Sequence, residues 1–151
     1  MVTIRKATAT DCGDVFRLIC ELEQERLPYP EFSTIFRNQL ESRQYSWLVA
    51  EVKGTVVGFL NLRCEQQLHH CAVIGEIIEM VVDPNHRDQG IGKALFDRAC
   101  ERAREQGCVQ IELGSRKTRT DAHRFYEREG MVNSHYKFTL PLTQAAPDTG
   151  E

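Results

Sequence analysis

The chain has no apolar run that approaches the roughly 20 residues of a membrane-spanning helix. It also has no excess of basic residues. Its formal net charge is −3, so nothing indicates a general electrostatic attraction to nucleic acid or to membranes. Residues 1–6 have the pattern of a strand and lack the features of a signal peptide. We therefore expect a cytoplasmic protein with no nucleic-acid or membrane partner.

Paired cysteine motifs are absent as well. None of the six cysteines forms a C-x-x-C pair, and none has the spacing of a zinc site. Without a secretion signal, such cysteines are expected to be reduced and structural.

The composition is that of an ordinary globular protein, with 41% hydrophobic and 27% charged residues. A chain of 151 residues suits one domain with a sizeable core, which we place at residues 1–142. The last residues, 143–151, are polar and contain Pro147 and Gly150, so we expect a disordered tail.

Hydrophobic periodicity predicts strands interspersed with helices. Strands are expected at residues 2–5, 47–52, 55–64, 73–82, 109–113 and 136–140, and helices at residues 11–26, 31–42, 91–106 and 121–129. Residues 73–82 should be the central strand, and residues 65–71 should form a loop. The second helix should bury four side chains, which are Phe32, Ile35, Phe36 and Leu40. This order predicts an α/β (α+β) fold in which helices cover both faces of a mixed sheet.

A glycine-containing turn follows the strand at residues 73–82. It reads Arg87, Asp88, Gln89, Gly90, Ile91, Gly92, and an amphipathic helix begins within it. Glycine lets a ligand approach the backbone N–H groups, and a helix N-terminus attracts anions. The turn lacks the Lys-Ser/Thr ending of a P-loop and the three glycines of a dinucleotide fold. It predicts a pyrophosphate site, although a plain turn between strand and helix would use the same residues.

Two blocks of sequence carry a wider resemblance. The first contains Val82 and Pro84 before Arg87, Gly90 and Gly92, and the second is Ala-His-Arg-Phe-Tyr-Glu-Arg-Glu-Gly at residues 122–130. In this order and separation they resemble the GCN5-related N-acetyltransferase (GNAT) family. The resemblance implies a mixed, mostly antiparallel central sheet flanked by helices, and acetyl-coenzyme A as cosubstrate.

Further stretches resemble one branch of that family, the members that acetylate aminoalkylphosphonates. These stretches are residues 18–22, 68–70, 74–77, 121–126, 128–130 and 134–135. The resemblance implies a small acceptor with a primary amine and a phosphonate, a divalent metal ion and a homodimer. Met131 departs from the aromatic residue usual in the family, and Arg119 stands where many members have asparagine.

The resemblance also implies a set of coenzyme contacts. Residues Met80, Val81 and Val82 would pair with the pantetheine amides like an added strand. The pyrophosphate would be held by Arg87, Asp88, Gln89, Gly90, Ile91, Gly92 and Lys93, although Lys93 could equally face solvent. Arg119 and Tyr126 would lie beside the coenzyme.

Two carboxylates, Glu76 and Glu79, interrupt the apolar run before Val82. Burial raises a carboxyl pKa toward neutrality, which suits a general base. Because they are three residues apart, a regular strand would place them on opposite faces. We favour Glu79 as the base, with Glu76 second or acting through water, and structural salt bridges as the alternative for both. Backbone N–H groups near Met80 and Val81 would stabilise the oxyanion.

Tyr126 matches the tyrosine that lies near the coenzyme sulfur in the resembling family, where it can protonate the thiolate. The alternative is an aromatic core residue beside Phe125.

Arginine suits a bidentate grip on phosphonate oxygens. The candidates are Arg26, Arg63, Arg119 and Arg124, each of which could instead be an ordinary surface residue. The basic run at residues 116–119 could also face the 3′-phosphate of the coenzyme. Metal donors could be His69, His70, His123 or His135, but spacing does not decide among them.

These observations predict an enzyme that transfers acetyl from acetyl-coenzyme A to a small aminoalkylphosphonate by direct attack in a ternary complex. Two alternatives remain. The acceptor could be a polyamine, an aminoglycoside or a protein amine, or the chain could be a non-catalytic acyl-coenzyme A-binding regulatory module.

Overall fold

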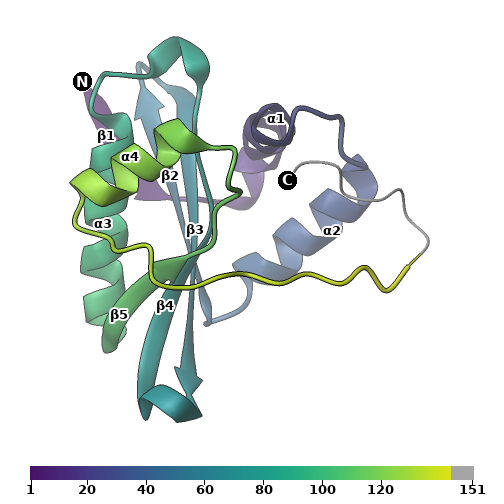
Figure 1. The fold of residues 1–151 in the computed structure, drawn as a ribbon. Coiled ribbons are helices and arrows are strands. Elements are labelled where there is room, and N and C mark those ends of the chain that lie inside the picture. The colour runs from purple at the N-terminus through teal and green to yellow at the C-terminus, as the bar shows by residue number, and fades with distance from the viewer. Residues whose placement is uncertain (144–151) are drawn as a thin grey trace. The chain divides into compact units, whose positions relative to one another are not determined.

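The computed structural model describes residues 1–143, which divide along the chain into two compact units between Glu112 and Leu113, so the last residue of the fifth strand already belongs to the second unit. The first unit contains, in chain order, β1 (Val2–Lys6), α1 (Cys12–Glu23), α2 (Tyr29–Leu40), β2 (Tyr45–Val52), β3 (Thr55–Gln67), β4 (Ala72–Val82), α3 (Ile91–Glu105) and β5 (Cys108–Leu113) (Figure 1). The second unit contains α4 (Thr120–Arg128). No helix among the described residues is long and apolar enough to cross a membrane.

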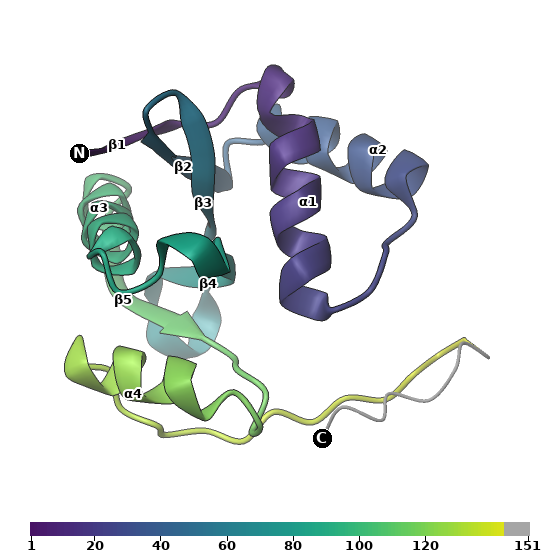
Figure 2. The same ribbon diagram turned by 90° about the horizontal axis from the view of Figure 1, so that it is seen from above.

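The five strands form one mixed sheet in the order β1-β2-β3-β4-β5. The pairs β1–β2, β2–β3 and β3–β4 are antiparallel. Helices α1 and α2 cover one face of the sheet, and α3 covers the other (Figure 2). The predicted fold class is confirmed. The prediction that residues 73–82 form the central strand is wrong, because β3 lies in the middle of the sheet and β4 lies beside it.

Both N-terminal helices differ from their predicted bounds. Helix α1 ends at Glu23, before the prolines, because Gln24 adopts a left-handed conformation with φ of 56°. Helix α2 begins at Tyr29, with Pro30 in its first turn, where a missing N–H costs no hydrogen bond. The prediction that Ile35 points inward is wrong, because its side chain is 55% exposed.

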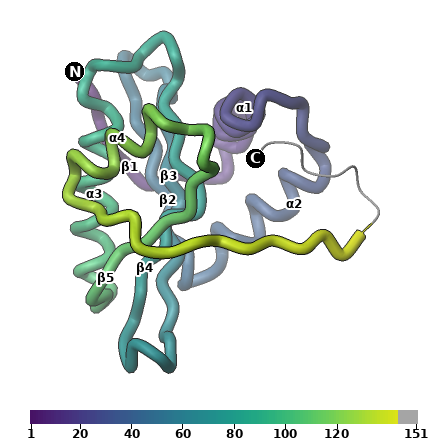
Figure 3. The backbone as a smooth tube through the Cα atoms, in the orientation of Figure 1, coloured from purple at the N-terminus to yellow at the C-terminus, as the bar shows by residue number. Residues whose placement is uncertain are grey.

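The hairpin of β3 and β4 is longer than the sequence predicts (Figure 3). Strand β3 continues to Gln67, and a short 3-10 turn at Leu68–His70 joins it to β4, so the predicted loop at residues 65–71 is wrong. The polar residues at its tip are mostly exposed, and a hairpin that projects into solvent tolerates such residues on both faces.

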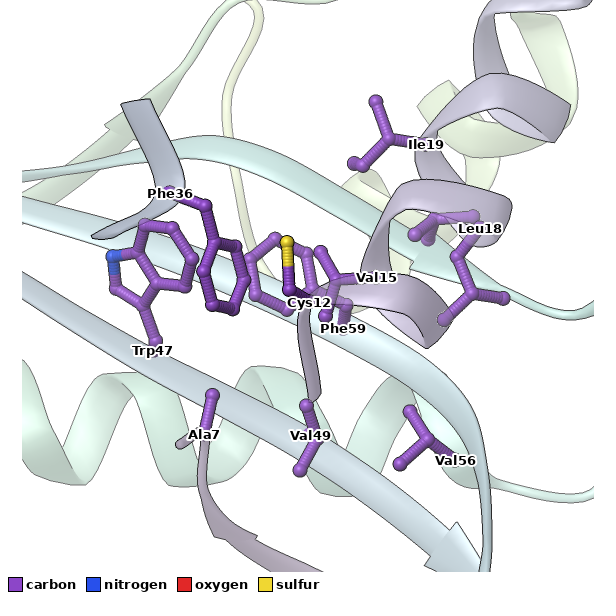
Figure 4. Packing of buried hydrophobic residues seen from close by; sticks show 11 residues of the cluster. Ala7, Cys12, Val15, Leu18, Ile19, Phe36, Trp47, Val49, Val56 and Phe59 are labelled. Carbon is purple, nitrogen blue, oxygen red and sulfur yellow. The ribbon is translucent and has the colours of Figure 1, made fainter. Parts of the chain in front are cut away.

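A hydrophobic core of eleven buried residues lies between the sheet and helices α1 and α2 (Figure 4). The Trp47 ring makes edge contacts with Phe36 and Phe59, at centroid separations of 4.5 and 5.3 Å. Val15 and Leu18 of α1 complete this side of the core and are almost fully buried. The core therefore fixes which residues of β3 and β4 can share a face with α1 and α2.

All six cysteines are free, and two of them lie together. The Cys108 thiol donates to the Cys64 sulfur at 3.4 Å. Burial is the largest cause that raises the pKa of the Cys64 thiol to about 12, and the neighbouring Cys108 thiol adds to it.

Cys64 should therefore react with a disulfide reagent much more slowly than the exposed Cys71 at about pH 8, because the thiolate is the reactive form. Mass spectrometry of peptides after timed labelling would measure the difference. Labelling of Cys64 at the rate of Cys71 would contradict the packing, and unfolding in denaturant should remove the protection.

In the second unit, α4 ends before Gly130, whose φ is 97°. The predicted strand at residues 136–140 is wrong, because this segment has no regular structure. Its apolar side chains are exposed: Tyr136 by 84%, Phe138 by 92% and Leu140 by 80%. Alternating apolar residues form a stable strand only when a neighbouring strand supplies hydrogen bonds. Apart from Thr143, the predicted tail at 143–151 lies outside the described residues.

Candidate active site

A β-bulge in β4 determines where the two carboxylates point. Asn61 of β3 pairs with Glu79, but the next residue, Leu62, pairs with Ile77, so Ile78 is an extra residue on β4. As a result, Glu76 pairs with Arg63, which is two residues after Asn61.

Residues two apart on a strand point to the same face, and so do paired residues on neighbouring strands. Glu76 and Glu79 therefore share one face of the sheet, and the prediction of opposite faces is wrong. The face is that of α1 and α2, since Gln39 of α2 accepts a hydrogen bond from Asn61 at 3.1 Å.

Glu79 lies in the surroundings expected of a general base. Its side chain is half-buried, and its Oε1 accepts a hydrogen bond from Asn61 Nδ2 at 2.8 Å. Burial raises the pKa of Glu79, the Asn61 hydrogen bond lowers it, and the negative charge of Glu23 at the end of α1 raises it. Burial is the largest of these effects, so the carboxylate binds a proton more readily than one in water.

Glu76 has a different environment on the same face. Its Oε1 accepts from Arg63 Nη2 at 2.7 Å, and its side chain is 33% exposed. Arg63 also contacts Glu65 at 3.2 Å. This cluster is the structural salt bridge considered as the alternative for Glu76, and it engages Arg63 with two carboxylates of its own chain.

The turn after β4 has the geometry of an anion-binding loop. The side chain of Asp83 accepts from the Asn85 backbone N–H at 2.9 Å and starts a 3-10 turn at Pro84–His86. Asp88 and Gly90 then adopt positive φ angles of 61° and 77°. Gly90 is the N-cap of α3 and provides no side-chain cap, so the first amides of the helix are not occupied by a capping side chain.

The remaining predicted coenzyme residues in this unit lie next to that turn. Met80, Val81 and Val82 end β4, where they pair with residues 58–60 of β3. Lys93 lies in the first turn of α3 and contacts Asp97 at 3.3 Å on the exposed side of the helix.

Tyr126 belongs to α4 in the second unit. It is half-buried, burial raises its pKa, and the nearby charge of Arg119 lowers it. Its ring lies 5.6 Å from that of Phe125, centroid to centroid, in an edge arrangement. Arg119 is the residue before α4, and Arg124 forms an ion pair with Asp121.

The candidate histidines are divided between the two units. The rings of His69 and His70 contact each other in the 3-10 turn in a tilted arrangement, with centroids 4.2 Å apart, whereas His123 Nε2 lies 2.9 Å from the Arg116 carbonyl oxygen. Among residues 1–143, no group of three or more His, Cys, Asp or Glu side chains could hold a metal ion. The described side chains therefore do not fit a protein-only metal site, and we assign no metal ligands.

Comparison with known proteins identifies the family. A profile of the acetyltransferase (GNAT) family matches residues 14–131. The aminoalkylphosphonate N-acetyltransferase of Salmonella typhimurium is 42% identical over 139 residues, which are 92% of this chain and 90% of that protein. The chain belongs to the GNAT family.

Solved structures agree with this GNAT assignment. A protein of Bacillus halodurans described as a transcriptional regulator has a TM-score of 0.86 and 30% identity, covering 93% of this chain and 99% of that one. The aminoglycoside N-acetyltransferase AAC(6')-Iy, solved in complex with CoA, has a TM-score of 0.84. It is 15% identical and covers 93% of this chain and 94% of that one, so it shows a shared fold.

Sequence reasoning missed Asn61 and Gln39 in this GNAT protein. The signal for Asn61 was available, because it is the one polar residue within the apolar run at residues 56–62, and the structure buries it to 2% exposure. Nothing comparable distinguishes Gln39, which lies on a half-polar helix and is identified only by its contact with Asn61.

Proposed function

We propose that this GNAT protein transfers acetyl from acetyl-coenzyme A to the primary amine of a small aminoalkylphosphonate. The main support for catalysis is the half-buried Glu79. Burial raises its affinity for a proton, and its Oε1 accepts a hydrogen bond from Asn61. The acceptor class is supported by the 42% identity to the Salmonella typhimurium enzyme.

In the proposed reaction, the amine attacks the thioester directly within a ternary complex. The substrate ammonium first loses a proton to Glu79, directly or through water. The amine lone pair then forms the C–N bond, and backbone N–H groups near Met80 and Val81 stabilise the oxyanion. Collapse of the tetrahedral intermediate breaks the C–S bond, and the leaving thiolate takes a proton from Tyr126.

For the coenzyme, we propose that the uncapped N-terminus of α3 and the turn from Arg87 to Lys93 hold the pyrophosphate. Met80 to Val82 would pair with the pantetheine amides. Arg119, which lowers the pKa of Tyr126 through its charge, would lie near the coenzyme sulfur with it.

For the acceptor, the phosphonate requires a cation in the same site. Arg63 is the least suited of the four candidate arginines, because Glu65 and Glu76 already contact it. Arg26 is exposed after the end of α1, with its guanidinium 5.7 Å from the centre of the Phe16 ring. We therefore favour Arg26 among the candidates of the first unit.

The direct test is thiol release from acetyl-coenzyme A with aminomethylphosphonate or aminoethylphosphonate as acceptor, and with spermidine and an aminoglycoside as comparison acceptors. Turnover with the phosphonates alone is expected. Turnover only with the polycations would leave the family unchanged and overturn the acceptor. A parallel series with a chelator tests the divalent metal that the related branch implies, and absence of turnover with every amine would favour the regulatory module.

Replacing Tyr126 with phenylalanine should lower kcat by roughly 10²-fold, because the thiolate then loses its proton donor. Tyr126 acts in its protonated form, and burial raises its pKa, so the wild-type rate should fall only at strongly alkaline pH. This alkaline limb should disappear in the variant. The exposed Tyr136 offers a matched control, because Tyr136→Phe should leave kcat unchanged. A Tyr126→Phe enzyme with the wild-type pH–rate profile would exclude the acid role.

A further inference from the structure

Asn61 joins α2 to the proposed base through both hydrogens of its amide. Its Nδ2 donates to Glu79 Oε1 at 2.8 Å and to Gln39 Oε1 at 3.1 Å. The residue is 2% exposed, and its Oδ1 is buried with no hydrogen-bond partner among residues 1–143. A buried carbonyl oxygen without a partner is unfavourable, and such atoms are few in native proteins.

The unpartnered oxygen follows from the two acceptors on the other side of the amide. If the amide were turned over, Oδ1 would face Gln39 Oε1 and the ionised carboxylate of Glu79, which both lack a hydrogen to donate. The observed orientation satisfies both N–H groups of Asn61, one with each acceptor, and leaves Oδ1 without a hydrogen bond. In this orientation, the hydrogen bond from Asn61 stabilises the ionised carboxylate of Glu79 and opposes the effect of burial on its pKa.

We propose that Asn61, oriented by Gln39, is a positioning residue that fixes Oε1 of Glu79 and leaves Oε2 to take the proton of the acceptor amine. This inference rests on the proposed role of Glu79 as the base. In the step, an N–H bond of the substrate ammonium breaks, its electron pair stays on nitrogen, and the proton forms an O–H bond with Oε2.

The surroundings of Glu79 give the direction of the expected change. Burial and the charge of Glu23 on α1 raise its pKa, and the hydrogen bond from Asn61 on β3 lowers it. Removing the Asn61 donor should therefore raise the pKa of Glu79 further. A base must be deprotonated to act, so the acidic limb of the pH–rate profile should move to higher pH.

The test follows Glu79 itself in the full chain, through the carbon-13 NMR shift of its side-chain carboxyl during a pH titration. In Asn61→Leu, which is apolar and of similar volume, Glu79 should titrate about one pH unit or more above its wild-type value. The acidic limb of kcat/KM should move by the same amount. An unmoved carboxyl titration would overturn the proposal.

Two further variants keep the test decisive. Gln39→Met retains Asn61 but removes the acceptor that orients it, so a smaller shift in the same direction is expected even if Asn61→Leu does not fold. Asn38→Leu makes the same chemical change as Asn61→Leu, at an exposed position of α2 next to Gln39. It should leave the titration of Glu79 unchanged.

The proposed base is tested separately with Glu79→Gln. A shifted Glu79 titration in Asn61→Leu, together with full activity of Glu79→Gln, would mean that Asn61 controls a carboxyl that is not the base. That result would overturn the positioning role of Asn61 in catalysis, although the effect of its hydrogen bond on the pKa of Glu79 would stand.

Discussion

Replacing Glu79 with glutamine should lower kcat by roughly 10²- to 10⁴-fold, the usual contribution of a positioned general base. The amide keeps the shape and the contact with Asn61 but cannot accept the proton of the ammonium. Because burial raises the pKa of Glu79, the wild-type rate should fall as the pH drops through a value above that of an ordinary glutamate, and the variant should lose this limb.

Glu76→Gln is the informative comparison, since both carboxylates lie on the same face. Glu76 is paired with Arg63 at 2.7 Å and is a third exposed, so its loss should cost less than about tenfold in kcat. Glu65→Gln removes the other partner of Arg63, at 3.2 Å, and serves as a control with wild-type activity. A large loss in Glu76→Gln with a small loss in Glu79→Gln would reverse the assignment of the base.

Gly90→Val should weaken binding of coenzyme A by at least about tenfold, as judged by calorimetric titration. Gly90 has a φ of 77°, which a β-branched residue adopts only with strain, and it is the N-cap of α3. Relief of that strain would move the amides that are proposed to contact the pyrophosphate, and the new branches would occupy the space of the phosphates.

Gly54→Val is a closely matched control. Gly54, in the turn between β2 and β3, has a φ of 78°, and an added Cβ at either glycine would meet no described atom within 4 Å beyond its chain neighbours. The two substitutions should therefore lower the melting temperature to a similar extent, while only Gly90→Val affects coenzyme binding. Equal coenzyme affinity in both variants would show that the pyrophosphate binds elsewhere.

Features with a local cause could be predicted from the sequence. The turn between the strands predicted at 47–52 and 55–64 and the start of α3 each have a glycine at positive φ, Gly54 and Gly90, and the structure has both features where expected. The preference for Glu79 over Glu76 as the base stays a prediction, and the contacts that distinguish the two carboxylates could not be predicted from the sequence, because they come from β3. Asn61 and Arg63, which distinguish the two carboxylates, are 18 and 13 residues away along the chain.

Features that depend on pairing could not be predicted in this way. The bulge at Ile78 has no marker in its own sequence, since isoleucine is an ordinary strand residue, and it exists only in the register between β3 and β4. The strand predicted at residues 136–140 does not form for a related reason. Alternating apolar residues do not supply the neighbouring strand with which they would have to pair.

The bulge at Ile78 has a consequence for the way this chain is aligned with its relatives. Glu76 and Glu79 are three positions apart, yet they occupy places that a regular strand would give to residues two positions apart. If Ile78 were deleted, Ile77 and Glu79 would follow one another and could still pair with Leu62 and Asn61. An alignment with any relative whose β4 is regular therefore needs a one-residue gap at Ile78. Without that gap, the residues on one side of Ile78 would be matched to residues of the opposite face.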